Sequence, residues 1–335
     1  MRTRQAVIKA TGGPEVIACR EVDLPPPGPG QVLVRHAAVG LNFIDTYHRS
    51  GLYPIELPGT LGLEAAGTIE AVGGGVTRFR VGDRVATFGP NRAAYADYQV
   101  TGENDLFAVP ESIGLDVAAA ALLKGLTTEM LAERVAPLAP GEWALVHAAA
   151  GGVGQLLLQW LVARGVRVIA TAGSPEKRSR ALALGAEHAI DADAPDMAQQ
   201  VREITAGAGV RASYDGVGKA KWEASLAATG RRGIVASYGN ASGPVAGVNL
   251  GSLAAAGSLF VSRPTLFDYY RDPAEREAGA ARLWQMIESG KVKVEIGQTY
   301  PLDQAETARY RADVPHAIRN GGTDIGKGLL VVLHR

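Results

Sequence analysis

Cysteine is almost missing from this chain, which has a single one, Cys19, among 335 residues. One cysteine cannot close a disulfide within the chain, and it cannot supply a zinc site built from several thiolates. A net charge is lacking as well, because 34 basic residues balance 34 acidic residues. Such a balance provides no long-range field to hold nucleic acid or an anionic membrane surface. We therefore expect neither as a partner.

Long apolar runs are also missing. No stretch approaches the roughly 18 uninterrupted apolar residues that a membrane-spanning helix needs. The first residues enter an alternating strand pattern, without the apolar stretch and small-residue cleavage site of a signal peptide. The sequence therefore predicts a cytoplasmic protein that has no membrane segment.

Up to about residue 110 the patterns favour β-structure. Short alternating segments are separated by turns rich in glycine and proline. We expect strands over residues 31–39, 65–72, 84–88 and 95–100. No long helical period interrupts these strands, so they predict a compact, partly open β-barrel.

From about residue 115 strands alternate with helices. Helices are expected over residues 117–131 and 153–163, with a further one that begins at Ser174 and Pro175. Strands are expected over residues 142–148, 166–172, 189–190, 212–215, 233–238 and 258–262. This alternation is typical of an α/β fold with a doubly wound parallel sheet.

The end of the chain has mixed character. Residues 274–289 are expected to be helical, and residues 292–296 and 329–333 to form strands. A terminal strand needs a partner, which the β-rich N-terminal part can supply. We therefore predict one domain from residues 1–123 and 263–335, with residues 124–262 inserted as a second, sheet-based domain.

A glycine-rich turn links the strand over residues 142–148 to the following helix. It reads Ala149-Ala150-Gly151-Gly152-Val153-Gly154. In a dinucleotide-binding turn, Gly151 would let the backbone approach the pyrophosphate, and Gly154 would let the helix pack closely on the strand. The N–H groups of the first helical turn would face the phosphates. A glycine needed only for helix packing explains Gly154, but not three glycines in four positions.

The end of the next strand indicates which dinucleotide is bound. A site for NADH usually has an acidic residue there, about 20 residues after the glycines, to bind the ribose hydroxyls. Here Ala172 is followed by Gly173 and Ser174, and Lys177 comes soon after. A hydroxyl and an ammonium suit a 2′-phosphate, so we predict NADPH. The alternative for Lys177 and Arg178 is a solvated helix face.

Several segments together resemble a known family. They are Gly12-Gly13-Pro14-Glu15-Val16, Gly40-Leu41-Asn42-Phe43-Ile44-Asp45-Thr46-Tyr47, Arg49-Ser50-Gly51-Leu52-Tyr53-Pro54, Lys124-Gly125-Leu126-Thr127, residues 147–154, Ser237-Tyr238-Gly239-Asn240-Ala241-Ser242-Gly243, Gly247-Val248-Asn249-Leu250 and Arg263-Pro264. The chain resembles, from end to end, the zeta-crystallin-like NADPH:quinone oxidoreductases of the medium-chain dehydrogenase/reductase superfamily. This resemblance implies a Rossmann domain inserted into a GroES-like, partly open β-barrel.

Zinc is not expected. In zinc-dependent relatives a cysteine and a histidine bind the catalytic metal, and Asn42 and Leu63 stand at those places. Neither side chain replaces a thiolate or an imidazole as a zinc ligand. An alcohol dehydrogenase needs a Lewis acid to activate its substrate, whereas a quinone already accepts hydride readily. The sequence therefore predicts reduction of an activated acceptor: a quinone or an α,β-unsaturated carbonyl.

The resemblance also implies roles for individual residues. Asn42 and Tyr47 are expected near the nicotinamide and the acceptor, with Tyr53 and Arg263 lining the substrate site. Tyr47 could equally be a tyrosine that packs in the barrel, and Asp45 is better explained as a structural partner than as an acid. His48 and His147 are weak candidates for a proton donor, and solvent can serve instead.

The same resemblance completes the expected cofactor site. Beyond the glycine turn and Lys177, it adds a residue of an earlier helix, two later strand ends and a lysine near the C-terminus. These residues are Asn42, Thr127, Tyr238, Gly239, Asn240, Val261, Ser262, Arg263 and Lys327. Relatives have a tyrosine near the adenosine phosphate where this chain has Asp191-Ala192-Asp193. Those two acids would oppose a 2′-phosphate.

A homodimer is expected through the strand over residues 258–262, because an apolar edge strand needs covering and relatives pair this edge. Two other functions compete with quinone reduction. A reductase of alkenals or enones would use the same hydride donor on a carbon–carbon double bond. A non-catalytic role, as a lens crystallin or in binding RNA, is known among relatives, and the neutral charge balance gives it little support.

Overall fold

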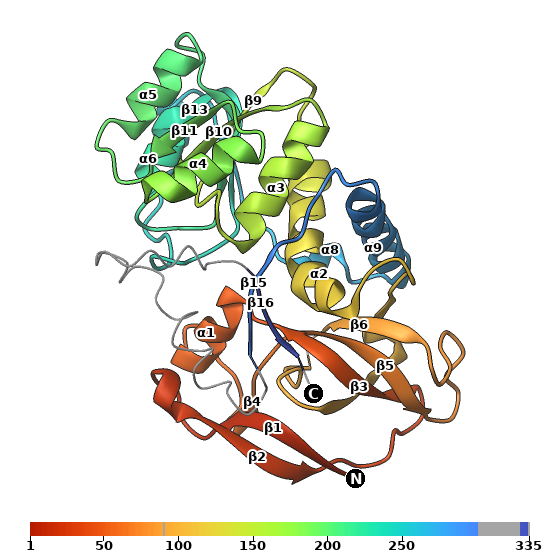
Figure 1. Ribbon diagram of the computed structural model, residues 1–335. Coiled ribbons are helices and arrows are strands. Elements are labelled where there is room, and N and C mark those ends of the chain that lie inside the picture. Colours follow the sequence, from red (N-terminus) through yellow and green to blue (C-terminus); the bar gives the residue numbers. More distant parts are fainter. Residues whose placement is uncertain (90, 301–328, 334–335) are drawn as a thin grey trace. The chain divides into compact units, whose positions relative to one another are not determined.

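The structure is a computed structural model that describes residues 1–89, 91–300 and 329–333. The chain divides into two compact units (Figure 1). The first consists of Met1–Leu123, Arg276–Ala280 and Val294–Arg335, and the second of Lys124–Glu275 and Ala281–Lys293. Within the described residues, no helix is long and apolar enough to cross a membrane.

The second unit includes residues 263–275, which the sequence analysis assigned to the N-terminal domain. A hydrogen bond explains this grouping, because the buried hydroxyl of Tyr270 donates to the carbonyl of Leu126 at 3.0 Å. Leu283, from the Ala281–Lys293 part of the same unit, packs where Gly125 leaves space for it. The division into functional domains at residues 123/124 and 262/263 stays a prediction.

Two β-sheets make up most of the first unit. The smaller sheet has the strand order β2-β1-β4, and the larger has the order β15-β16-β3-β5-β6-β8, with β7 paired to β3. The strands are β1 (Arg2–Ile8), β2 (Ile17–Asp23), β3 (Gln31–Gly40), β4 (Gly59–Thr60), β5 (Glu64–Val72), β6 (Arg84–Phe88), β7 (Tyr98–Gly102), β8 (Leu106–Ala108), β15 (Ile296–Tyr300) and β16 (Leu329–Leu333).

The last strand returns to the first part of the chain. β16 pairs antiparallel with β3, with Val331 opposite Gly40, so the prediction that the terminal strand rejoins the N-terminal part is confirmed. β15 begins at Ile296 and not at Val292. Val292 is buried, and its N–H donates to the carbonyl of Met286 at 3.0 Å, which keeps it with the preceding helix.

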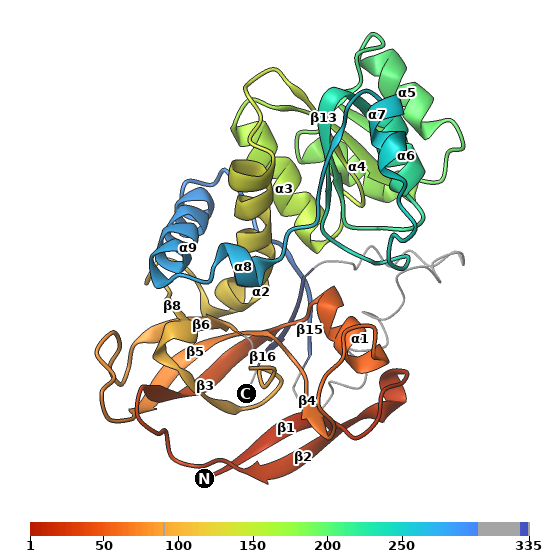
Figure 2. The ribbon, with the colours of Figure 1, turned by 180° about the vertical axis from the view of Figure 1, so that it is seen from behind.

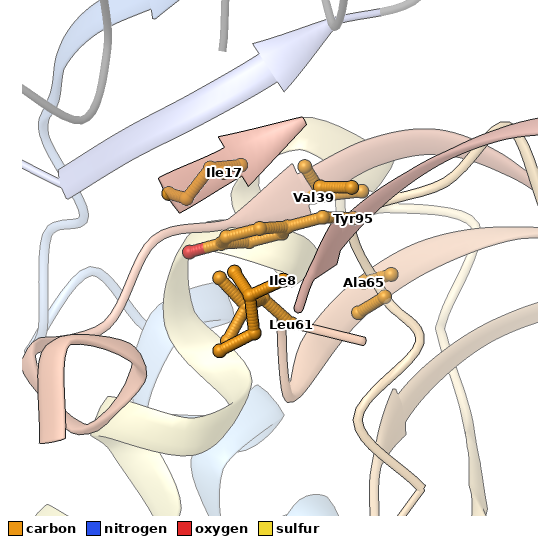
Figure 3. Close-up of a cluster of buried hydrophobic side chains, with 8 residues drawn as sticks. Ile8, Ile17, Val39, Leu61, Ala65 and Tyr95 are labelled. Carbon is orange, nitrogen blue, oxygen red and sulfur yellow. The ribbon is translucent and has the colours of Figure 1, made fainter. Parts of the chain in front are cut away.

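A cluster of buried side chains connects the two sheets of this unit (Figure 3). The ring of Tyr95 lies among aliphatic side chains from the surrounding strands, with its hydroxyl at the edge of the cluster. The labelled members are Ile8, Ile17, Val39, Leu61, Ala65 and Tyr95. Tyr95 was expected to begin a strand, but its carbonyl accepts from Ala6 of β1 at 2.8 Å, so β7 starts only at Tyr98.

The second unit contains a parallel sheet with the strand order β11-β10-β9-β12-β13-β14. Its strands are β9 (Trp143–Val146), β10 (Arg167–Ala172), β11 (His188–Asp191), β12 (Val210–Asp215), β13 (Thr229–Ser237) and β14 (Phe260–Ser262). Numbered along the chain, this is the order 3-2-1-4-5-6 of a Rossmann fold. The predicted doubly wound sheet is therefore confirmed.

Two of these strands are shorter than expected by two or more residues, for local reasons. β9 ends at Val146 because the chain turns at residues 147–150, and β14 starts at Phe260 instead of Ser258. Ser258 has φ +57, outside the strand region, and the N–H of Leu259 donates to Leu253 of the preceding helix at 3.0 Å.

Helices cover the parallel sheet and link its strands. Helix α7 lies beside α6 (Figure 2), where Trp222, Leu226 and Leu253 belong to one buried cluster with Val235 of β13. Across both units, the helices are α1 (Phe43–Ser50), α2 (Leu115–Glu129), α3 (Gly152–Ala163), α4 (Pro175–Ala183), α5 (Met197–Ile204), α6 (Trp222–Ala228), α7 (Leu250–Ala255), α8 (Leu266–Tyr269) and α9 (Pro273–Glu288). A π-helical turn, Met130–Val135, follows α2 directly.

Candidate functional site

The glycine-rich turn lies at the carboxyl end of β9. On one side of β9 the next strands along the chain are β10 and β11, and on the other side they are β12, β13 and β14, so the strand order reverses at β9. Open α/β sheets bind their ligands at such a position. Ala148 has φ +48, and its carbonyl accepts from the N–H of Gly151 at 2.8 Å, closing a tight turn. The N–H of Ala149 donates to Thr171 of β10 at 3.0 Å, which fixes the turn to the neighbouring strand.

A close contact requires glycine at position 154 of this turn. A Cβ on Gly154 would lie 2.3 Å from the carbonyl oxygen of Ala148, so only glycine lets α3 start this near to the strand end. A Cβ on Gly151 would lie 3.0 Å from the same oxygen. No acidic residue stands in the first turn of α3, and its N-terminal N–H groups carry the positive end of the helix dipole. Ala150, Gly151, Gly152 and Val153 thus present backbone that suits a pyrophosphate.

Several other predicted cofactor residues of the second unit follow the ends of neighbouring parallel strands. Gly173 follows β10, and a Cβ there would meet no atom within 4 Å. Ser174 caps α4, and its hydroxyl accepts from the N–H of Lys177 at 3.4 Å. The expected capping role of Ser174 is therefore confirmed.

Residues after β13 and β14 lie at the same edge of the sheet. The N–H of Tyr238 donates to the carbonyl of Asp215 at 2.9 Å, which holds the turn of Tyr238, Gly239 and Asn240 against the end of β12. The guanidinium of Arg263 donates from Nη1 to the carbonyl of Ser237 at 2.8 Å. The structure thereby places Val261, Ser262 and Arg263 beside the end of β13.

A fully buried polar network lies directly beneath the glycine turn. His147, at the end of β9, has Nδ1 3.0 Å from the hydroxyl of Thr171 and Nε2 3.0 Å from the hydroxyl of Ser225. Ser225 in turn donates to Asp215 at 3.3 Å. Burial lowers the pKa of His147, and nearby Lys221 adds to this effect, while Asp215 opposes it. A neutral imidazole with both nitrogens engaged connects the end of β9 to β10 and to helix α6, and neither nitrogen is left to donate a proton to a substrate.

Asn42, in the first unit, is also buried and held by hydrogen bonds. Its amide Nδ2 donates to Glu64 at 2.8 Å, and its backbone N–H donates to Asp45 at 2.9 Å. The same oxygen of Asp45 accepts from the hydroxyl of Tyr95 at 2.7 Å. Glu64 is fully buried and also accepts from the N–H of Leu123 at 2.7 Å. Asp45 and Glu64 therefore fix the start of α1 and the orientation of the Asn42 side chain.

Tyr47 and Tyr53 belong to an aromatic group on α1 and the turn that follows it. Their ring centroids are 5.0 Å apart, and Tyr47 also contacts Phe43 at 5.3 Å. Tyr47 is buried, in agreement with a packing role, and Tyr53 is half-buried. His48 packs against Tyr53, and burial, with a contribution from Arg92, lowers the pKa of His48 to about 4. His48 is thus neutral near pH 7.

The predicted residues fall into two groups. Asn42, Tyr47 and Tyr53 come together in the first unit, whereas Arg263 and the strand-end residues belong to the second. Thr127 is buried on α2 in the second unit, and Lys327 lies outside the described residues. The roles of all these residues stay predictions.

Glu64, Ser225 and Asp215 were not predicted from the sequence to have a role. Glu64 follows Leu63, which stands where a zinc-dependent relative has a metal ligand. This position could have indicated that Glu64 lies close to the site. Ser225 and Asp215 offered none, because their contacts with His147 bring together three separate segments: the end of β9, the end of β12 and helix α6.

Family models match two parts of the chain. Residues 28–137 match the alcohol dehydrogenase GroES-like domain, and residues 152–271 match the zinc-binding dehydrogenase family. Within the described residues, no group of three or more histidine, cysteine, aspartate or glutamate side chains could hold a metal ion. Asn42, at the place of a metal ligand, donates its amide N–H to Glu64 instead.

Individual proteins match the whole chain. A quinone oxidoreductase from Pseudomonas aeruginosa is 48% identical over 94% of this chain and 96% of that protein. A 2-haloacrylate reductase from a Burkholderia species is 38% identical over 97% of this chain and 98% of that protein. The solved structure of Escherichia coli quinone oxidoreductase complexed with NADPH has a TM-score of 0.93 and 38% identity, and covers 98% of this chain and 99% of that one. The chain belongs to the quinone oxidoreductase family of the medium-chain dehydrogenases/reductases.

Proposed function

We propose that this protein is an NADPH-dependent quinone reductase that works without a metal ion. The observation that carries the proposal is the glycine turn at the reversal point of the Rossmann sheet, which leaves backbone N–H groups at the start of α3 for a pyrophosphate. The family supports the same cofactor, since the Escherichia coli relative was solved with NADPH.

The preference for NADPH over NADH is supported by the end of β10. Ala172, Gly173 and Ser174 offer no carboxylate for the ribose hydroxyls. Lys177 follows in the first turn of α4, where its backbone N–H donates a hydrogen bond to the hydroxyl of Ser174. A 2′-phosphate would therefore meet an ammonium and the N-terminus of a nine-residue helix.

When bound, NADPH supplies a hydride that reduces the quinone to a hydroquinone, together with one proton. The chain's own contribution is positioning. Glu64 and Asp45 orient Asn42, which is proposed to lie near the nicotinamide, and the aromatic group of Tyr47 and Tyr53 is proposed to bound the acceptor. His48 and His147 are both neutral and buried, so solvent is the proposed source of the proton.

One relative favours a second candidate reaction. The Burkholderia 2-haloacrylate reductase bears the name of an activated double-bond substrate, and this chain matches nearly all of it. Reduction of an enone or alkenal needs the same hydride donor and no metal. The product distinguishes the two reactions, because a quinone gives a hydroquinone or semiquinone and an enone gives a saturated carbonyl.

The test is a screen of NADPH oxidation over simple quinones and enones, repeated with NADH and with a metal chelator. We expect the highest kcat/KM with a quinone and NADPH, and no loss of rate with the chelator. Faster turnover of an enone than of every quinone would favour the second candidate. A rate that the chelator abolishes and zinc restores would refute the metal-free reaction.

The oligomeric state and compartment go with this proposal. We propose a homodimer that pairs β14, the last strand of the parallel sheet, across a two-fold axis. The exposed apolar side chains of Phe260 and Val261 on this strand support it. We also propose a cytoplasmic location, which fractionation of cells that produce the protein would test.

A further inference from the structure

Two acidic residues stand at the place where the 2′-phosphate of NADPH is proposed to bind. β11 runs parallel to β10, with Asp191 opposite Ala172, the last residue of β10. The chain then turns through Ala192 to Asp193, and the N–H of Ala192 donates to the carbonyl of Ala172 at 3.1 Å. The backbone therefore brings both carboxylates next to the Gly173–Ser174 turn. Considered alone, they would repel a phosphate.

Each of these acids is joined to a cation from a different segment of the chain. Arg178 of α4 reaches Oδ2 of Asp191 with Nη1 at 3.0 Å, and the same nitrogen donates to the carbonyl of Ala172 at 3.3 Å. The other oxygen of Asp191 accepts from the N–H of Asp193 at 3.0 Å. Asp191 is thus engaged through both oxygens, and Arg178 is held at the end of β10.

Lys221 plays the corresponding part for Asp193. It precedes α6, and its ammonium donates to the carbonyl of Ala192 and lies 3.5 Å from Oδ1 of Asp193. Its side chain is 16% exposed, although that of Asp193 is 83% exposed. A lysine that is mostly buried beside a solvated carboxylate is held chiefly by the backbone carbonyl.

The charges around this strand end therefore cancel. Glu176, Asp191 and Asp193 are matched by Lys177, Arg178 and Lys221. Exposed ion pairs of this kind add only about 0–1 kcal/mol to stability. Their effect on a charged ligand is larger, because each cation lies within a few ångströms of the acid that the ligand would meet.

We propose that Arg178 and Lys221 determine cofactor specificity by shielding Asp191 and Asp193, so that this acidic turn accepts a 2′-phosphate. The inference rests on the proposed use of NADPH. It differs from the role of Lys177, which is expected to contact the phosphate directly. It also accounts for how a strand end with two acids can accept NADPH.

The test compares binding of 2′,5′-ADP and 5′-AMP, which differ only in the 2′-phosphate, by isothermal titration calorimetry. Arg178→Met and Lys221→Met each expose one acid, so each should weaken 2′,5′-ADP by roughly tenfold and leave 5′-AMP unchanged. The double variants Arg178→Met/Asp191→Asn and Lys221→Met/Asp193→Asn remove the exposed acid too, and should regain affinity to within about twofold of wild type.

Arg167→Met is the matched control. Arg167 pairs with Glu187 at 2.8 Å at the opposite, amino end of β10, so its loss should change neither ligand. Thermal melting of every variant checks that the unit stays folded. Double variants that remain as weak as the single ones would overturn the proposal, because the cations would then bind the phosphate themselves. Unchanged single variants would overturn it as well. Wild-type protein that binds 5′-AMP as tightly as 2′,5′-ADP would instead refute the proposed use of NADPH.

Discussion

Lys177 is the single residue on which the predicted choice of cofactor depends most. A charge-assisted hydrogen bond contributes about 1.5–3 kcal/mol, so Lys177→Ala should weaken NADPH binding roughly 10- to 150-fold. NADH has no 2′-phosphate, and its dissociation constant should hardly change. Fluorescence titration with both dinucleotides measures the two values. An equal loss for NADPH and NADH would mean that Lys177 supports the fold of α4 and not the phosphate.

His48 makes stability depend on pH. Burial lowers its pKa in the folded protein from 6.5 to about 4, so between these values the unfolded chain binds a proton that the folded chain does not. Stability should therefore fall as the pH is lowered through this window. When the pH is lowered from about 7 to about 5, the free energy of unfolding should fall in both proteins. We expect the fall to be about 1–2 kcal/mol smaller in His48→Phe than in wild type. Urea unfolding at the two pH values measures this, and equal losses in both proteins would contradict it.

The sequence correctly predicted the roles of single residues that depend only on nearby residues in the chain. Ser174 caps its helix, and Gly154 fills a position that has no room for a side chain, both as expected. The effect of Asp191 and Asp193 was not predictable, because their partners Arg178, in α4, and Lys221, just before α6, are brought near only by the folded sheet. The pairing of His147 with Ser225 was hidden for the same reason.

The junction between β9 and α3 can be tested as an element. In Gly154→Ala the new methyl group would be 2.3 Å from the carbonyl oxygen of Ala148, so the helix must move away from the strand. Such overpacking typically costs about 1–3 kcal/mol, and the displaced N–H groups should also weaken dinucleotide binding. Gly173→Ala is the control, since its methyl group would meet no atom within 4 Å. If Gly154→Ala and Gly173→Ala melted at the same temperature, α3 would have space to move away from the strand.

Strands with a clear alternation were predicted closely, and irregular ends were not. β6 has the expected bounds, and β3 is one residue longer than expected. Helix α1 was not predicted, because it has only eight residues and its start depends on Asp45 contacting Tyr95 from far along the sequence. Strand ends such as that of β9 were missed where a turn with a positive φ, here at Ala148, replaces the regular pattern.

The proposed dimer is a property of the whole molecule. β14 is the last strand of its sheet, and Phe260 on it is 60% exposed. We expect light scattering at micromolar concentration to show a dimer for wild type and a monomer for Phe260→Glu, which places a charge on the pairing edge. Leu182→Glu is the control, because Leu182 is an exposed apolar residue on α4 and away from this strand. A monomeric wild type would refute the dimer, and a dimeric Phe260→Glu would move it to another surface.

The pairing of β16 with β3 has a consequence for biosynthesis. A ribosome releases β3 early, but β16, which pairs with residues 38–40 at one end of this strand, is translated much later. The parallel sheet, by contrast, has all six of its strands once β14 has emerged. The nascent chain should therefore complete its Rossmann sheet first, while residues 38–40 of β3 wait for a partner beside the part of the strand that β7 already pairs. A premature stop codon just before β16 would thus leave a finished nucleotide-binding sheet attached to an aggregation-prone barrel.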